Sequence, residues 1–263
     1  MGTIAITGSA SGIGAATRER LEQQGHRVLG VDMHGAEVAC DLGTGEGRAE
    51  AVDRITAECD GRLDGLVTCA GIPGVPTRQG SALVSVNYFG TVALLRGLRP
   101  ALAAAERPAV VCLSSNSATC QPNWLVPVAE ACFADEEERA RELADEHGAV
   151  GAYPATKAAI AWYVRSHAPA AEWTGAGIRL NAVAPGHIET GMTAEVRRDP
   201  ALGEALEAFP TPRGAPGRPA EVAALIDFLL GAEGALLCGS VVYADGGTDA
   251  ALRPKDWPAV WSL

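Results

Sequence analysis

The sequence lacks the segments that direct a chain into or across a membrane. No uninterrupted apolar run reaches the roughly 18 residues that a membrane span needs. Residues 1–6 carry no basic leader ahead of an apolar stretch. We therefore expect a soluble, unexported protein with no membrane partner.

Positive charge is also scarce. The 21 basic residues are outnumbered by 32 acidic residues, and the formal net charge at pH 7 is −11. Such a protein repels the phosphates of nucleic acids and offers no basic stripe on which they could bind. We expect no nucleic-acid partner.

The spacings typical of metal sites and disulfide frameworks are missing as well. The seven cysteines are odd in number, scattered, and form no Cys-x-x-Cys pair, and the five histidines form no His-Glu-x-x-His pair. We therefore expect no metal and a reducing, cytoplasmic location. The histidines are interpreted as surface or satisfied core residues.

The 263 residues are 48% hydrophobic and 20% charged, which is typical of a globular protein with a sizeable core. Short β-branched runs alternate with helical patterns. Strands are predicted at 3–6, 27–31, 37–40, 65–69, 108–114, 178–183 and 240–244, and helices at 12–24, 44–58, 81–104, 152–170 and 219–231. This alternation predicts an α/β protein with a doubly wound, seven-stranded parallel sheet and helices on both faces, in a single domain spanning residues 1–263.

Two segments interrupt the alternation. Residues 121–151 form an acidic, helix-prone insertion, which we interpret as a solvated helical excursion. Residues 187–219 are rich in proline and glycine and follow the end of a strand. Ligand-covering loops of open α/β sheets lie at such ends, so this segment is predicted to be a substrate loop.

A glycine-rich turn at residues 7–14 follows the first predicted strand and leads into a helix. Glycines allow a tight turn and let a pyrophosphate approach backbone N–H groups at the positive helix end. The predicted contacts with a dinucleotide of the Rossmann type are Gly8, Ser11, Gly12, Ile13 and Gly14. The same spacing also occurs in ordinary loops.

Asp32 ends the second predicted strand, twenty residues after Gly12. In a dinucleotide site an acid at this place binds the hydroxyls of the adenosine ribose. Its carboxylate would repel a 2′-phosphate, so the sequence favours NAD(H) over NADP(H). A turn or capping role is the alternative for Asp32. Asp41, which closes the third strand, is predicted to approach the adenine or to form a turn.

Tyr153 and Lys157 are four residues apart near the start of a predicted helix, and therefore share one helix face. A cation within about 4–6 Å lowers the pKa of a group such as a phenol by about one to three units. The pair therefore predicts a phenolate base. Lys157 is one of two lysines among the basic residues. The alternative is a chance pair on the surface.

In this order the motifs resemble those of the short-chain dehydrogenase/reductase family over essentially the whole chain. Other shared motifs are Cys69-Ala70-Gly71, Asn87, Ser114-Ser115, Pro185-Gly186 and Thr190. Within the family the chain is most similar to bacterial 3α-hydroxysteroid dehydrogenase/carbonyl reductases, which share the opening at 6–16, the segment 85–90 and the insertion.

The resemblance implies a catalytic set of Asn87, Ser115, Tyr153 and Lys157. Tyr153 would be the general acid/base, Lys157 would lower its pKa and hold the nicotinamide ribose, and Ser115 would bind the developing oxyanion. Asn87 would hold a helix kink and a water, or else bond its own backbone. Besides Tyr153 and Lys157, the implied contacts with NAD are Leu42, Cys69, Ala70, Gly71, Pro185, Gly186, Ile188 and Thr190.

Two positions depart from the family's pattern. Cys69 stands where members usually carry asparagine, and a thiol replaces the hydrogen bonds of an amide only weakly. Ser115 precedes Tyr153 by 38 residues because of the insertion. Ser114 therefore remains a rival to Ser115, and Ser117 is less favoured.

We expect an NAD-dependent oxidoreductase that interconverts a secondary alcohol and a ketone on a bulky apolar ring substrate, first of all a 3-hydroxysteroid or 3-oxosteroid. The alternatives are a cyclic terpene or another alicyclic or aryl alcohol, and a catalytically idle NAD-binding sensor or scaffold. Candidate residues of the substrate cleft, or else of the core or an interface, are Trp124, Met192, Phe209, Trp257 and Trp261. The family also implies a homodimer or homotetramer formed through two long helices.

Overall fold

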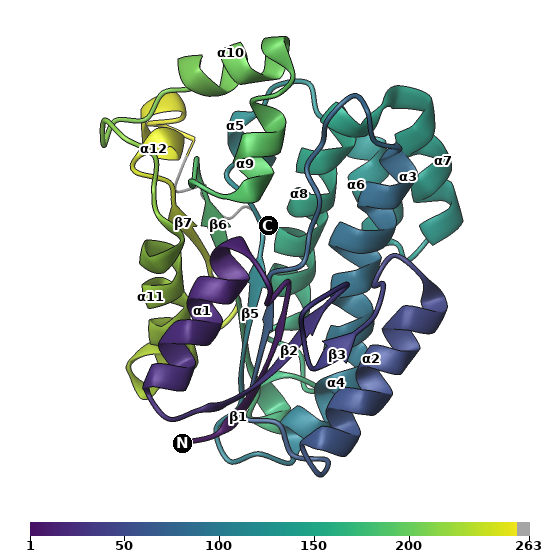
Figure 1. The fold of residues 1–263 in the computed structure, drawn as a ribbon, viewed down its shortest axis with the longest axis vertical. Helices are drawn as coiled ribbons and strands as arrows, with labels where there is room; N and C mark the ends of the chain where they lie inside the picture. Colours follow the sequence, from purple (N-terminus) through teal and green to yellow (C-terminus); the bar gives the residue numbers. More distant parts are fainter. Residues whose placement is uncertain (257–263) are drawn as a thin grey trace, which may run out of the picture.

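The computed structural model describes residues 1–256, in which seven strands form one parallel sheet (Figure 1). The strands are β1 (Thr3–Thr7), β2 (Arg27–Asp32), β3 (Val38–Ala39), β4 (Gly65–Thr68), β5 (Ala109–Leu113), β6 (Arg179–Pro185) and β7 (Val241–Ala244). Their order is β3-β2-β1-β4-β5-β6-β7. The order of the chain reverses between β1 and β4, and open α/β sheets bind ligands beyond the carboxyl ends of the strands at such a point.

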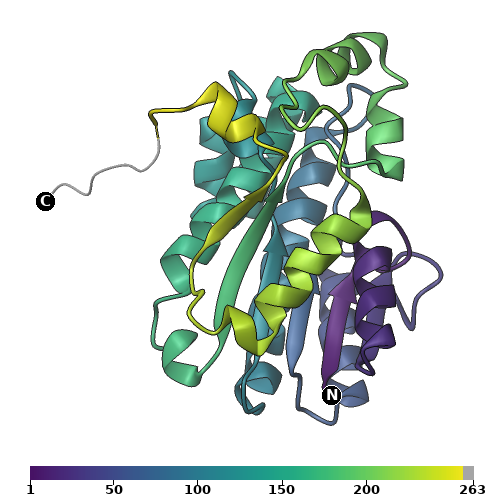
Figure 2. The same cartoon turned by 90° about the vertical axis from the view of Figure 1, so that its left-hand side faces the viewer.

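Helices cover both faces of the sheet (Figure 2). On one face lie α1 (Gly12–Gln23) and α11 (Pro219–Leu230), and on the other lie α2 (Gly45–Glu58), α4 (Gly90–Ala103) and α8 (Ala149–His167). Each face has its own buried apolar cluster. All five residues of β5 are buried, as expected for a parallel strand covered on both sides. The predicted fold class is confirmed.

The helix predicted at 81–104 is interrupted. It consists of α3 (Gly80–Leu83), a π-helical turn η1 (Val84–Phe89) and α4. Thr91 Oγ1 donates to the carbonyl of Asn87 at 2.9 Å inside this irregular stretch. By length and composition alone Gly80–Ala103 could cross a membrane, with a mean hydropathy of 1.2, but 72% of that window is buried inside the protein.

The insertion differs from the expected solvated excursion. It follows α5 (Ser117–Cys120) and forms α6 (Val126–Phe133) and α7 (Glu137–His147). Four of the eight residues of α6 are buried, and they belong to the cluster that also contains α8. Because alanine and valine occupy the inward positions, these helices can pack closely on the main body. The insertion is therefore part of the core on this face.

The predicted substrate loop contains two short helices, α9 (Gly191–Val196) and α10 (Pro200–Ala208). Thr190 caps α9 by accepting from the N–H of Thr193, and Asp199 caps α10 by accepting from the N–H of Leu202. No residue of α10 is buried. This segment, called the lid below, lies at the top of Figure 1 beyond the carboxyl ends of the strands. Short elements complete the described chain: η2 (Thr174–Ala176), η3 (Ala232–Gly234) and α12 (Thr248–Leu252).

Candidate active site

A hollow of about 380 Å³, the first hollow, opens beyond the carboxyl ends of β1, β2 and β4. Twelve of the residues predicted to contact the dinucleotide line it: Gly8, Ser11, Gly12, Ile13, Gly14, Asp32, Asp41, Leu42, Cys69, Ala70, Gly71 and Thr190. Pro185, Gly186 and Ile188 are not in its wall. Ile188 is buried and packs against Gly217, and Gly186 lines a neighbouring hollow.

The glycine-rich turn is shaped by its own backbone. Gly8 has a φ of +65°, which residues with a side chain rarely adopt. A Cβ on Gly14 would lie 2.1 Å from the carbonyl oxygen of Gly8, so the helix can approach the strand only without one. Ser11 precedes α1 in an extended conformation and makes no capping bond with its side chain. The first N–H groups of α1 are therefore available to an anion.

Asp32 accepts hydrogen bonds from nearby backbone N–H groups and also lines the first hollow. Its Oδ2 accepts from the N–H of Ala10 at 3.0 Å, and its Oδ1 accepts from its neighbour Met33 at 2.8 Å. A carboxylate has about four lone-pair sites, so acceptor capacity remains for hydroxyls in the first hollow. Arg78 also lines this hollow, but its guanidinium is paired with Glu195 at 2.8 Å. Arg78 is thus held by a carboxylate from the lid.

A second hollow, of about 360 Å³, lies beneath the lid. Ser115 and Tyr153 line it, and it shares Pro73 and Met192 with the wall of the first hollow. The hydroxyl of Tyr153 lies 3.9 Å from Sδ of Met192. The two hollows therefore adjoin, with the phenol at their junction.

Most of the second hollow is apolar. Its wall includes Pro122, Val150, Met192, Val196, Leu202, Ala205, Leu206 and Phe209. Of the five candidate cleft residues, Met192 and Phe209 line it. Trp124 does not: its ring packs against Trp162, with 6.2 Å between centroids, because α6 docks on α8. Trp257 and Trp261 lie outside the described residues.

The two rival serines have different surroundings. Ser114 Oγ is buried and donates to the carbonyl of Lys157 at 2.8 Å, so it links the end of β5 to α8. Ser115 Oγ accepts from the N–H of Ser117 at 3.1 Å and faces the second hollow. Its own O–H remains free to donate to a ligand beside Tyr153.

Burial sets the protonation of the tyrosine and the lysine. It raises the pKa of Tyr153, and the neighbouring Ser115 hydroxyl opposes this shift only in part. Burial lowers the pKa of Lys157 to about 8. Nζ of Lys157 donates to the carbonyl of Leu113 at 2.9 Å and lies 5.9 Å from the centroid of the Tyr153 ring. In this structure burial therefore sets the direction of the Tyr153 pKa, and the lowering by Lys157 stays a prediction.

Asn87 holds the segment after β4. It is fully buried in the π-helical turn, and its Oδ1 accepts from the N–H of Ile72 at 2.8 Å while Nδ2 donates to the Ile72 carbonyl at 3.1 Å. A Cβ on Gly71 would lie 3.2 Å from Oδ1 of Asn87 and 3.5 Å from Nζ of Lys157. The Asn87 amide and the Lys157 ammonium thus both lie against Gly71. Burial raises the pKa of Cys69 to about 12, so its thiol stays neutral beside them.

Sequence reasoning missed His187, which was grouped with the surface or satisfied core histidines. It lines the second hollow, and its side chain is 5% exposed. Its Nε2 lies 3.0 Å from Nη2 of Arg197. A guanidinium can only donate, so Nε2 must accept and Nδ1 must carry the proton. Burial and Arg197 both lower the pKa of His187, which favours this neutral form. Its place directly after Pro185-Gly186 was the available signal.

Size alone does not locate the site. A larger hollow, of about 480 Å³, opens beyond the amino ends of the strands, around His26, Arg62, Asp64 and Arg179. It contains none of the predicted site residues. No cluster of three or more possible metal ligands occurs among residues 1–256.

Comparisons with known proteins agree with this geometry. Family models described as short chain dehydrogenase and as enoyl-(acyl carrier protein) reductase match residues 2–128 and 144–249. The residues between the two matches, 129–143, belong to the insertion. A 3-alpha-hydroxysteroid dehydrogenase/carbonyl reductase of Comamonas testosteroni is 41% identical over 260 residues, covering 98% of this chain and 100% of that protein.

Two further relatives are similar over nearly the whole chain. A cis-4-hydroxycyclohexanecarboxylate dehydrogenase of Sinomonas cyclohexanicum is 30% identical, covering 93% of this chain and 95% of that protein. The crystal structure of the 3-alpha-hydroxysteroid dehydrogenase from Pseudomonas sp. B-0831 complexed with NADH has a TM-score of 0.92 and 45% identity, covering 96% and 99% of the two chains.

Proposed function

The chain belongs to the short-chain dehydrogenase/reductase family, and on this premise we propose that it is an NAD(H)-dependent enzyme that interconverts a secondary alcohol and a ketone. The observation that carries the proposal is the position of Tyr153 at the junction of a glycine-walled hollow and an apolar one. The first hollow would take the dinucleotide and the second the ring substrate. The adjoining walls at Met192 would bring the carbinol carbon next to the nicotinamide.

The first hollow fits a dinucleotide without a 2′-phosphate. The uncapped start of α1 would bind the pyrophosphate and Asp32 the adenosine ribose. Lys157 does not line the hollow itself, but its Nζ lies behind Gly71 in the wall, and from there it would bind the nicotinamide ribose. Asp32 disfavours a 2′-phosphate, and the nearby Arg78 is already paired with Glu195. The NADH complex of the 45%-identical relative supports the same choice. When bound, NAD⁺ supplies the acceptor for the hydride of the alcohol.

Tyr153 would move the proton at the substrate oxygen. Because burial raises its pKa, the phenol is the resting form at neutral pH and can donate a proton to the oxygen of a ketone. Ser115 would donate its free O–H to the same oxygen and stabilise the developing charge. In the oxidative direction the phenolate takes the proton back. Asn87 would act by holding the 71–72 segment against Lys157.

We propose a 3-hydroxy/3-oxosteroid as the substrate. The second hollow has a volume of about 360 Å³ and a largely apolar wall, which suits a rigid hydrocarbon ring system. Both hydroxysteroid dehydrogenases above are more than 40% identical to the chain. The similarity to the cis-4-hydroxycyclohexanecarboxylate dehydrogenase supports a smaller alicyclic alcohol as the alternative substrate.

A substrate panel tests the proposal. The purified protein is assayed with NAD⁺ and NADP⁺ against 3-hydroxysteroids, cyclic terpenols, 4-hydroxycyclohexanecarboxylate and aryl alcohols, with reduced cofactor formation as the readout. We expect steroid turnover with NAD⁺. Turnover of the smaller alcohols alone would refute the steroid assignment. NADH binding without turnover of any alcohol would favour the idle sensor or scaffold.

We also propose a cytoplasmic homo-oligomer. All seven cysteines are free, which suits a reducing compartment. The insertion covers part of α8, one of the long helices, through Trp124 and Trp162. Exposed apolar residues that could contact a second copy are Phe228 of α11, Leu236 after η3 and Tyr243 of β7. Light scattering tests this, since a monomer at working concentration would contradict it.

A further inference from the structure

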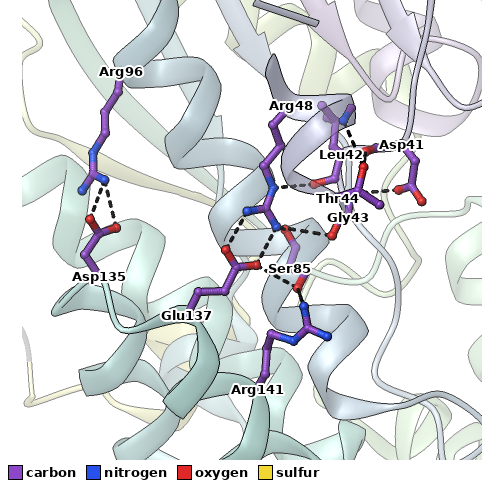
Figure 3. Close-up of polar contacts among 11 residues, drawn as sticks. Asp41, Leu42, Gly43, Thr44, Arg48, Ser85, Arg96, Asp135, Glu137 and Arg141 are labelled. Atoms are coloured by element: carbon purple, nitrogen blue, oxygen red, sulfur yellow. Dashed lines mark hydrogen bonds and ion pairs between the residues drawn. The ribbon is translucent and has the colours of Figure 1, made fainter. Parts of the chain in front are cut away.

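An ion pair between a buried arginine and a partly exposed glutamate joins the insertion to the nucleotide-binding half of the sheet (Figure 3). Arg48 of α2 is 9% exposed, and its Nη1 and Nη2 each donate to one carboxylate oxygen of Glu137, both at 2.7 Å. Glu137 is the first residue of α7. Two parallel bonds between a guanidinium and a carboxylate fix the orientation of both groups. The insertion is therefore held in a defined position against α2.

The same guanidinium holds the backbone beside the first hollow. Nε of Arg48 donates to the carbonyl of Leu42 at 2.8 Å. Its Nη2 also donates to the carbonyls of Ser85 at 2.9 Å and Gly43 at 3.4 Å. Leu42 lines the first hollow. Arg48 thus connects α7, η1 and the segment after β3, as Figure 3 shows.

Glu137 is the ionised partner of this buried cation. Burial would raise the pKa of Glu137, but the bonds from Arg48 outweigh burial and the net shift is downward. Ser85 Oγ adds a bond to the same carboxylate at 2.9 Å. A buried charge that loses its partner is strongly disfavoured. Without Glu137, Arg48 would gain by turning toward water and would release the carbonyls of Leu42 and Gly43.

We propose that Glu137 is a positioning residue for the cofactor: through Arg48 it fixes the wall of the first hollow at Leu42, next to Asp41, where the adenosine end of NAD(H) binds. The inference rests on the proposed function, because it requires a dinucleotide with its adenosine ribose at Asp32. It gives the insertion a role in cofactor affinity, separate from the chemistry at Tyr153.

A second ion pair provides a matched control. Arg96 of α4 pairs with Asp135, two residues before Glu137, at 2.8 Å (Figure 3). Their side chains are 50% and 51% exposed, and neither lines the first hollow. Water screens an exposed pair, so its contribution is small. Breaking it should leave cofactor binding unchanged.

The test compares the full-length Glu137→Gln and Asp135→Asn proteins with the parent by NADH fluorescence titration and steady-state kinetics. Couplings between sites are typically about 5- to 150-fold, and we expect the Kd for NADH and the KM for NAD⁺ to rise about tenfold in Glu137→Gln. Its kcat and alcohol KM at saturating NAD⁺ should stay at parental values, and Asp135→Asn should bind like the parent. Parental affinity in folded Glu137→Gln would overturn the proposal. Failure of the parent to bind NADH would instead overturn the proposed function.

A double variant separates positioning from folding. Arg48→Met/Glu137→Met removes both charges together, so neither is left without its partner. We expect a folded protein with a lower Tm than the parent, because the carbonyls of Leu42 and Ser85 lose their donor. NADH binding should weaken, because no side chain then holds the Leu42 carbonyl. Since coupling is reciprocal, NADH should slow amide exchange at the start of α7 in the parent and not in the double variant. Parental NADH affinity in the double variant would overturn the proposal.

Discussion

The two hollows meet at Pro73 and Met192 but have walls of different kinds. The first is formed largely by backbone turns at the ends of buried strands, where Gly14 leaves no room for a side chain. The second is closed by the lid, whose α10 buries no residue. The first hollow is therefore fixed by the fold itself, and the second depends on side chains of a thinly anchored segment.

The contacts that hold the lid support this difference. Arg197 pairs with Glu189 at 2.8 Å and with Glu207 at 3.0 Å. The side chains of Arg197, Glu189 and Glu207 are 32%, 50% and 64% exposed. Exposed pairs are worth about 0–1 kcal/mol each. Arg78 pairs with Glu195 of the lid at 2.8 Å, and these side chains are 35% and 30% exposed. The lid can therefore change position at a lower cost than the glycine turn. We infer that the molecule combines a preformed cofactor site with an adaptable substrate site.

The largest expected effect comes from Tyr153→Phe, which removes a proton donor from the junction and leaves the first hollow intact. Acid–base catalysis contributes about 10²- to 10⁴-fold, so we expect kcat for alcohol oxidation to fall about a thousandfold or more, with the Kd for NADH unchanged. Tyr163→Phe is the matched control, because Tyr163 is a buried tyrosine of the same helix that lines neither hollow. An active Tyr153→Phe enzyme would contradict the proposed mechanism.

Gly14→Ala tests the first hollow by adding a side-chain atom to its wall, whereas Tyr153→Phe removes an atom at the junction. The new Cβ would lie 2.1 Å from the carbonyl oxygen of Gly8, so the turn must shift. A displacement of about 1 Å can cost on the order of 100-fold, and we expect a loss of that size in kcat/KM for NAD⁺. The control is Gly45→Ala at the start of α2, where no atom lies within 4 Å of the added Cβ. Parental NAD⁺ kinetics in Gly14→Ala would mean that this hollow is less rigid than its geometry indicates.

The same contrast explains what could be predicted from the sequence. The walls of the first hollow come from short motifs, so Gly8, Gly14 and Asp32 could be assigned to it by position along the chain. The family resemblance contributed Leu42, and periodicity contributed the strands. These features depend on neighbours in sequence, which a single sequence records directly.

Features that depend on distant packing could not be settled from sequence spacing. For Trp124 the sequence left both the cleft and the core open, and docking of α6 on α8 places its ring against Trp162. The kink at Asn87 was expected from the family resemblance alone, because the π-helical turn leaves no periodic signal within a long apolar helix. Spacing gives Tyr153 and Lys157 a shared helix face but does not give the burial that raises the pKa of Tyr153. In each case the information that the sequence lacks is how distant elements bury or contact a side chain.

The smallest expected effect concerns the pH dependence of alcohol oxidation, which reports on the two buried groups beside the hollows. Burial keeps the pKa of Tyr153 above its ordinary value, so the phenolate fraction, and with it the rate, should rise about tenfold per pH unit from neutral pH upward. Burial also lowers the pKa of Lys157 to about 8. Above that pH the lysine loses the charge that favours a nearby phenolate, so the rise should become shallower.

Lys157→Arg separates the two titrations. A guanidinium stays charged throughout this range, so the slope of log(kcat/KM) for the alcohol should lose its break near pH 8, even though the rate itself is lower. Ketone reduction needs the protonated phenol and should remain level over the same interval. The measurement is a pair of pH profiles for the parent and Lys157→Arg, in both directions. A break that persists in Lys157→Arg would assign it to another group, and a level oxidation profile under rate-limiting chemistry would mean that the buried phenol does not carry the proton.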